Sequence, residues 1–207
     1  MIVLEEAAEA YTVRGASLEI SFRRAVDLWQ HFVSFRTHAG SQLLLASDEG
    51  TPAADVPDSP ALQDLRFEKL SDEIFEFQLL GQAGKGFYSA AVRFDGKVQA
   101  IDFDLCARGC SADSSVCTVS RYEIAGDSAA SVKPQQDGAL VVLVRGEPAV
   151  DLSPVPIEGI PTTECQLIGA ELHRRIAAGC FGSTPSDAPR KPASVRWRYR
   201  IALAGHP

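Results

Sequence analysis

The chain has 207 residues, of which 45% are hydrophobic and 23% charged, so it is long enough to bury a sizeable core as one domain. Its net charge of -7 and pI near 5.1 argue against a general nucleic-acid-binding role, because phosphate binding relies on a positive surface. The acidic N-terminus and the lack of an apolar run of about 18 residues exclude a signal peptide and a membrane span, so we expect a cytoplasmic protein.

The N-terminal quarter is predicted to hold a hairpin and then a helix. Alternating apolar residues over 9–22, interrupted at Gly15, indicate two strands or one bent strand with a bulge. Between 23 and 36 the apolar residues instead recur at helical spacing, which predicts an amphipathic helix. The residues that define its apolar stripe are Val26, Leu28, Trp29, Phe32, Val33 and Phe35.

A short strand at 42–47 is followed by an acidic segment with three prolines near 48–61. Proline cannot sustain either kind of regular structure through this segment, so we expect a flexible loop or a lid. Strands at 65–70 and 75–79 then form a hairpin that leads into a second one, which completes a meander of four strands.

The second hairpin, from Gly86 to Cys106, is the strongest strand prediction, because two alternating runs flank the turn dipeptide Asp95-Gly96. Placing Phe94 opposite Lys97 assigns each side chain to a face. The predicted core face carries Tyr88, Ala90, Val92, Phe94, Ile101, Phe103 and Leu105. The other face carries Phe87, Ser89, Ala91, Arg93, Val98, Ala100, Asp102 and Asp104.

The C-terminal half is predicted to hold three strands and one helix. Strands at 115–123 and 140–144 flank a polar loop near 124–138. Thr163 as N-cap, Gln166 three residues later and Gly179 as the stop predict a helix over 163–179. After a loop near 181–193 rich in Pro and Ser, the chain ends in a strand at 194–203.

These elements predict a single α+β domain over 1–207. Its sheet is mainly antiparallel, either curved or a partly open β-barrel of seven to nine strands, and two helices pack on it. The loops near 48–61, 124–138 and 181–193 are expected to be flexible.

The last strand places three arginines on alternate positions of one face, about 7 Å apart. Arg196, Arg198 and Arg200, together with Ser89 on the central hairpin, are therefore the candidate ligand-binding residues, suited to an anion or an acidic partner. A solvated face, a charge-protected edge or pairing with carboxylates explains the same pattern.

Asp102 and Asp104 have the same alternate spacing on the less apolar face of the hairpin. Two close carboxylates can bind a hard cation or divide acid and base roles, although no third ligand or partnering histidine stands beside them. Asp102, Asp104, Arg198 and Arg200 are the first catalytic candidates to test. A simpler hypothesis is that the aspartates and arginines share one sheet face and neutralise each other.

No metal site or cofactor is predicted. Cys106, Cys110 and Cys117 form C-x3-C-x6-C, which lacks the paired knuckles of zinc sites, so free thiols are expected, with a Cys106–Cys117 disulfide as the alternative. The four histidines match no H-E-x-x-H pattern, and no serine lies in a G-x-S-x-G turn. His31 is expected at the surface of the first helix or at the core edge. The others are His38, His173 and His206.

The leading functional hypothesis is a non-catalytic binding or interaction module that holds a small ligand or a protein partner on the concave face of the sheet. An enzyme with a site of acidic and arginine residues on the sheet face is one alternative. A structural subunit of a homo-oligomer, with the strand of Trp197 and Tyr199 at the interface, is another. The sequence does not decide between enzyme and binding module, and it identifies neither the ligand nor the biological process.

Overall fold

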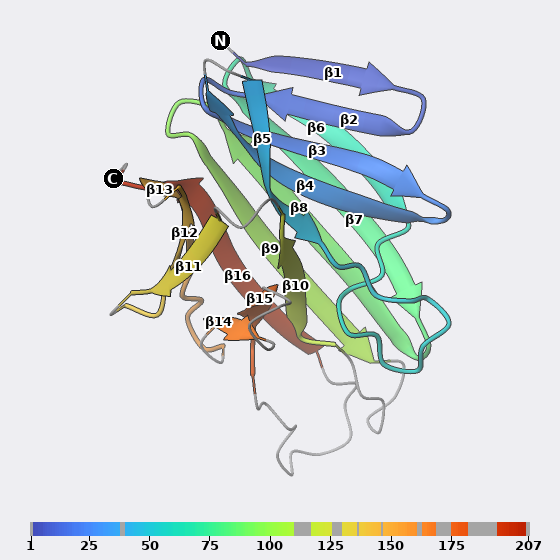
Figure 1. The fold of residues 1–207 in the computed structure, drawn as a ribbon. Coiled ribbons are helices and arrows are strands. Elements are labelled where there is room, and N and C mark those ends of the chain that lie inside the picture. Colours follow the sequence, from blue (N-terminus) through green and yellow to red (C-terminus); the bar gives the residue numbers. More distant parts are fainter. Residues whose placement is uncertain are drawn as a thin grey trace.

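The structure is a computed structural model that describes residues 2–37, 40–109, 117–125, 130–135, 137–145, 147–160, 163–168, 175–181 and 194–205. Within these residues the regular structure consists of sixteen β-strands in two antiparallel sheets of eight (Figure 1). No helix in this part of the chain is long and apolar enough to cross a membrane.

The first sheet, sheet A, holds most of the N-terminal strands together with three later ones, in the order β1-β2-β3-β4-β5-β10-β15-β14. Its strands are β1 (Val3–Ala7), β2 (Ala10–Arg14), β3 (Leu18–Ala25), β4 (Leu28–Thr37), β5 (Gly40–Ser47), β10 (Val119–Ile124), β14 (Glu164–Ile168) and β15 (Arg175–Gly179).

The second sheet, sheet B, has the order β11-β12-β13-β16-β9-β8-β7-β6, so the C-terminal strand β16 lies beside the central hairpin. Its strands are β6 (Asp64–Ser71), β7 (Ile74–Ala83), β8 (Gly86–Asp95), β9 (Ala100–Gly109), β11 (Ala130–Pro134), β12 (Leu140–Val144), β13 (Glu147–Pro154) and β16 (Ser194–Leu203).

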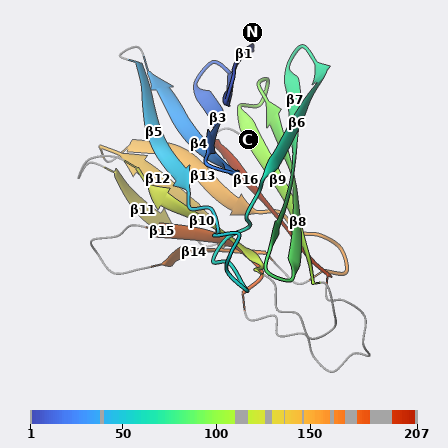
Figure 2. The ribbon, with the colours of Figure 1, turned by 90° about the vertical axis from the view of Figure 1, so that its right-hand side faces the viewer.

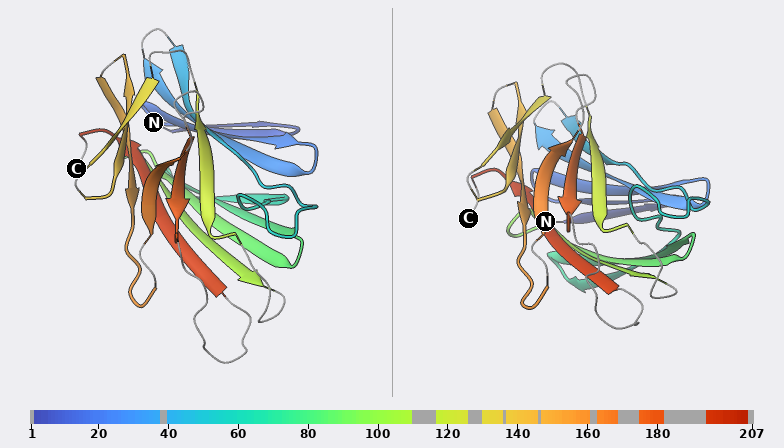
Figure 3. Two further views of the ribbon diagram at one scale, coloured as in Figure 1. Left: turned by 60° about the horizontal axis from the view of Figure 1, so that its bottom comes forward. Right: turned by 90° about the horizontal axis from the view of Figure 1, so that it is seen from below.

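The core lies between the two sheets, which face each other as layers (Figures 2 and 3). Aromatic side chains meet across the layers: the rings of Phe22 on β3 and Phe77 on β7 have centroids 4.5 Å apart. Tyr11 on β2 similarly lies 5.2 Å from Phe67 on β6. Each strand contributes alternate residues to this layer because side chains along a strand point to opposite faces. The fold is therefore held mainly by burial of these inward faces.

The α+β prediction is wrong, because both predicted helices are strands in the described residues. The segment 23–36 forms the end of β3, a two-residue turn at Val26-Asp27 and most of β4. Val26, the first residue of the apparent helical stripe, is 96% exposed in the turn. The buried residues Trp29, His31 and Val33 alternate along β4, and the polar His31 conceals this alternation in the sequence.

The second predicted helix, 163–179, contains β14 and β15, with 169–174 outside the described residues. The Thr163 hydroxyl caps no helix, since it accepts a hydrogen bond of 3.1 Å from the backbone N–H of Arg198. Every residue of β15 from Ile176 to Gly179 is buried, so the strand shows no alternation that could reveal it in the sequence.

The strand count and the barrel are also wrong, since the sixteen strands form two separate sheets that do not close into a barrel. The four-stranded meander β6 to β9 and the final strand β16 are confirmed.

In the central hairpin Phe94 pairs with Ile101 and not with Lys97, because the loop spans Gly96 to Gln99. The partner of each residue is thus shifted by four positions, an even number, which leaves the predicted core face buried.

The loop over 48–61 connects β5 in sheet A to β6 in sheet B and is packed at several points. The side chain of Ser59 is buried, and its hydroxyl accepts from the backbone N–H of Arg121. A Cβ at Gly81 would lie 1.7 Å from the carbonyl oxygen of Ala61, so the loop lies directly against β7. Of the other two predicted loops, 124–138 includes β11, and 181–193 is described only at Phe181.

The turn at Val26 gives a stability prediction. Val26 has φ of 61°, whereas the φ of Asp27 is not positive. This combination is typical of a type II′ turn. Such a turn favours glycine at its first central position, which Val26 occupies. Replacing Val26 by glycine should raise the free energy of unfolding by about 1 kcal/mol, because a β-branched residue is strained there. Urea denaturation measures the change. Asp27→Gly is the matched control and should not stabilise the protein; equal stabilisation by both variants contradicts the prediction.

Candidate functional site

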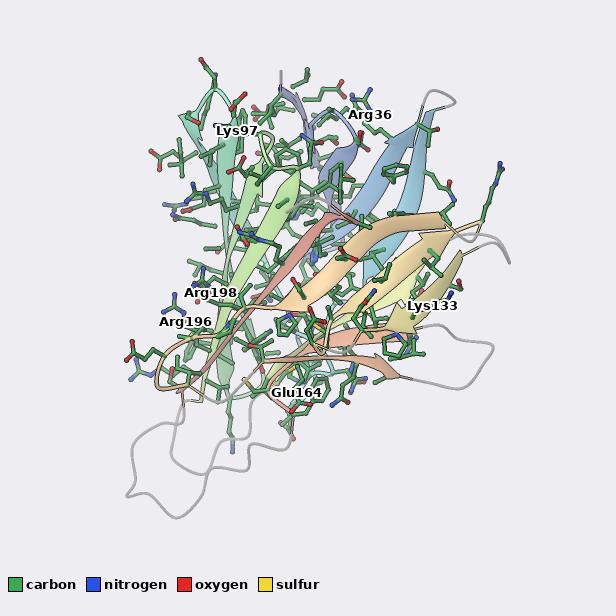
Figure 4. All side chains as sticks on the ribbon, turned by 90° about the vertical axis from the view of Figure 1, so that its left-hand side faces the viewer. Arg36, Lys97, Lys133, Glu164, Arg196 and Arg198 are labelled. Carbon is green, nitrogen blue, oxygen red and sulfur yellow. The ribbon has the colours of Figure 1, made fainter. Side chains whose placement is uncertain are left out.

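The predicted ligand-binding residues lie together on the outer face of sheet B. β16 pairs with β9 so that Arg198 stands opposite Asp104 and Arg200 opposite Asp102. Alternate residues of β16 point inward, and Trp197 and Tyr199 are fully buried between the arginines. In Figure 4 the labelled Arg196 and Arg198 side chains extend from the outer side of this strand.

The two aspartates and three arginines lie on one face and form two separate sets of ion pairs, one around Asp104 and one at Asp102. Arg200 donates from Nε and Nη2 to the two oxygens of Asp102, at 2.7 and 2.9 Å. Arg196 makes the same two-pronged contact with Asp104. The Nε of Arg198 lies 3.3 Å from Asp104, an ion pair without the two short hydrogen bonds that Arg196 and Arg200 form. The three guanidinium groups therefore share two carboxylates.

This pairing changes the chemistry expected of Asp102 and Asp104. The hydrogen bonds to the carboxylates raise the pKa of both Arg196 and Arg200, so these side chains stay positive. A carboxylate that already accepts two hydrogen bonds from one guanidinium suits binding and positioning better than proton transfer.

A shallow hollow of about 450 Å3 lies next to the arginine row on the same face. Ser89 and Ala91 on β8 contribute small side chains to its lining. Asp104, Cys106 and Arg196 line it as well, and the exposed Leu80 on β7 adds an apolar surface. The structure thus brings Ser89 together with Arg196, whereas Arg198 and Arg200 continue the row along β16.

The outer face of β8, β9 and β16 carries both positive and negative side chains. Its outward positions carry five arginines and three aspartates, an excess of two positive charges. These residues are Arg93, Arg108, Arg196, Arg198, Arg200, Asp95, Asp102 and Asp104. The strands on either side add Glu76, opposite Arg93, and Asp151, opposite Ala202, so the positive excess is confined to these three strands.

A second cluster, which the sequence did not reveal, lies inside the core. Glu49 Oε1 lies 3.2 Å from His31 Nδ1, an ion-pair distance without the angle of a hydrogen bond. His31 Nε2 lies 2.8 Å from the Tyr122 hydroxyl, which in turn lies 2.6 Å from the Tyr199 hydroxyl. This chain of polar groups crosses from sheet A to β16 of sheet B.

All four side chains of this buried chain are shielded from water. The side chain of Glu49 is 4% exposed and that of His31 8%. Burial raises the pKa of Tyr122 and of Tyr199, so both tyrosines are neutral hydroxyls at neutral pH. A carboxylate, an imidazole and a hydroxyl in series resemble a nucleophilic relay in order, but the hydroxyls point at each other in the core.

No local pattern in the sequence could have predicted this cluster, because its members come from four distant positions. His31 lies on β4, Glu49 follows β5, Tyr122 lies on β10 and Tyr199 on β16. The one usable signal was the position of His31 between Trp29 and Val33, which fits the inward face of a strand.

The remaining candidates give no site in the described residues. Cys106, Cys117 and Cys165 are free thiols, and no group of three His, Cys, Asp or Glu side chains in this part of the chain could hold a metal ion. The other positions considered from the sequence lie outside the described residues: His38, Cys110, His173 and His206.

No protein-family model matches the chain, and a search of curated proteins found no match.

The buried chain gives a second prediction. Tyr122→Phe should lower the free energy of unfolding by about 1–3 kcal/mol, because it leaves both His31 Nε2 and the Tyr199 hydroxyl without their shared partner. Tyr199→Phe should cost less, since Tyr122 keeps its contact with His31. Urea denaturation of both variants and the double variant gives the coupling between the two hydroxyls.

Tyr11→Phe is the control for this cycle, because the Tyr11 ring packs against Trp29 and Phe67 in the same core. Its change should stay within about 0.5 kcal/mol. Strict additivity of the Tyr122 and Tyr199 substitutions contradicts a coupled pair.

The thiols give a third prediction. Burial raises the pKa of Cys117 to about 11 and that of Cys165 to about 12, so neither forms much thiolate at pH 8. In a Cys110→Ser variant, iodoacetamide at pH 8 should therefore label the half-buried Cys106 before Cys117 or Cys165. Peptide mass spectrometry at successive times measures the order in which the cysteines are labelled. Faster labelling of Cys165 than of Cys106 contradicts the prediction.

Proposed function

We propose that the protein is a non-catalytic binding module that takes an anionic group of a small ligand or protein partner on the outer face of sheet B. The residues assigned to this role are Arg196, Arg198 and Arg200, with Ser89 in the adjoining hollow. The observation that carries the proposal is that three guanidinium groups in a row share only two carboxylates.

Arg198 is the centre of the proposed site. Arg196 and Arg200 each donate two hydrogen bonds to one carboxylate, whereas Arg198 has a single closest approach to Asp104, through Nε at 3.3 Å. Guanidinium presents five donors in a planar fork, so Arg198 can offer its terminal amino groups to a carboxylate or phosphate oxygen. Ion pairs on both sides hold the row in place before the ligand arrives, which lowers the ordering cost of binding.

A binding role fits these residues better than the enzyme alternative. Asp102 and Asp104 are occupied by arginines, and the carboxylate–imidazole–hydroxyl series lies within the core. The side chains of Trp197 and Tyr199 are fully buried within the chain, so they offer no support for assembly through this strand.

We also propose a cytoplasmic location. The support is chemical: Cys106, Cys117 and Cys165 are free thiols, the state that a reducing compartment maintains.

The test is a titration of the isotope-labelled full chain with inorganic phosphate at constant ionic strength, followed by amide chemical shifts. Phosphate should perturb residues of β9 and β16 most. Arg198→Gln should weaken binding about threefold to tenfold, the loss expected for one exposed charge-assisted contact.

Arg23→Gln is the matched control, because Arg23 is an exposed arginine on sheet A that lies over the Phe32 ring. It should leave phosphate affinity unchanged. Equal affinity in wild type and Arg198→Gln, or equal weakening by Arg23→Gln, refutes a site at Arg198.

A further inference from the structure

Each sheet ends in strands whose outer backbone groups pair with no other described strand, and such edges can pair with another chain. The edges are β1 and β14 in sheet A and β11 and β6 in sheet B. β11 ends in Lys133-Pro134, and proline and lysine are common protections of an edge. β1 carries two adjacent acids, Glu5 and Glu6, so a second copy of β1 would bring like charges together.

β6 differs from these edges in length and in charge pattern. It has eight residues and no proline, and it stands at the margin of sheet B beside β7 (Figure 2). Its register with β7 places Leu65 and Phe67 on the core side, opposite Leu79 and Phe77. Arg66 and Glu68 therefore lie on the outer face, and both are exposed. The outer face of this edge thus carries Asp64, Arg66 and Glu68, and the oppositely charged Arg66 and Glu68 are neighbours on it, two residues apart.

We propose that β6 pairs with β6 of a second copy of this chain, antiparallel about a two-fold axis at Phe67. In this register Arg66 of each copy stands directly opposite Glu68 of the other. The two-fold axis generates this pair twice, and Asp64 of each copy stands opposite the uncharged Leu70 of the other. Cross-strand neighbours lie about 4.5–5.5 Å apart, a distance at which opposite charges attract.

The remaining residues of the strand are compatible with this register. Leu65 faces Lys69 of the second copy, whose methylene stem can cover it. The ammonium group of Lys69 lies 2.8 Å from Asp72 in the turn of its own copy, so the charge of Lys69 is already paired within that copy. A register shifted by two residues would place Asp64 opposite Glu68, which repels. The charges therefore select the axis at Phe67.

The neighbouring chain limits pairing to β6 itself. Beyond Asp64 the edge of β7 is already covered by the preceding loop, because Gln63 donates its backbone N–H to Leu80 and Gly84 donates to Pro52. The proposed contact between the two copies is therefore about one strand long. Such a small contact sits at the weak end of protein interfaces, so we expect a reversible dimer that forms with rising concentration.

Sedimentation velocity on the full chain, from about 10 μM to about 1 mM to cover weak interfaces, tests the proposal. Wild type should shift reversibly from monomer to dimer. Arg66→Glu and Glu68→Arg should each weaken dimerisation at least tenfold, because each converts two attractive pairs into two repulsive ones. Circular dichroism and thermal melting establish that both variants fold.

Two restorations make the test specific for this register. An equimolar mixture of Arg66→Glu and Glu68→Arg should form heterodimers, since each acidic copy then faces a basic one. The chain that carries both substitutions should dimerise with itself like wild type. Arg198→Gln should dimerise normally, which separates this inference from the anion site.

A wild-type chain that stays monomeric over the whole range overturns the proposal. Dimerisation of the single reversals at wild-type strength, or a mixture that stays monomeric, also overturns it, because either result places any contact elsewhere.

Discussion

The hydrogen bond between the Tyr122 and Tyr199 hydroxyls joins the two sheets at the centre of the core, and much of the structure depends on it. Each hydroxyl is fully buried, so each needs a partner. Tyr122 finds its other partner in His31, and His31 lies beside the carboxylate of Glu49. Because each polar group requires the next, the contact fixes the position of β4, β10 and β16 relative to one another.

The same constraint orders the outer face of sheet B. Tyr199 must point inward to reach Tyr122, and Trp197 points inward to donate its indole N–H to Ser120, at 3.2 Å. Side chains alternate along a strand, so Arg196, Arg198 and Arg200 are forced outward as a row. The pairing of β16 with β9 then sets Asp104 and Asp102 against them. The interior of the sandwich thereby determines the spacing of the proposed anion site.

The sequence predicted well those strands whose inward and outward faces differ in polarity. β16 alternates aromatic or aliphatic residues with arginine, and its bounds were predicted correctly. The central hairpin was assigned to the correct faces despite a wrong turn, because the register error was even. The pairing of aspartates with arginines followed from these two strands alone.

The predictions failed where a strand carries a polar residue inward or is buried on both faces. His31 occupies an inward position of β4, where an apolar residue would show the alternation of a strand. Without that signal, the apolar Trp29 and Phe32, three residues apart, indicate a helix. β15 is buried from Ile176 to Gly179 and therefore shows no alternation. The buried polar chain could not be predicted because its four residues meet only after both sheets have formed.

Substitutions in the polar core should destabilise the protein much more than substitutions on the charged outer face. A buried hydroxyl or carboxylate leaves its partner unsatisfied when it is removed, so the core cluster is costly to change and acts as a structural element. An exposed ion pair contributes little stability, because water and salt screen it. The arginine row on sheet B and the alternating charges on β6 can therefore be altered with little loss of fold, which is the condition under which surface charge is free to serve recognition.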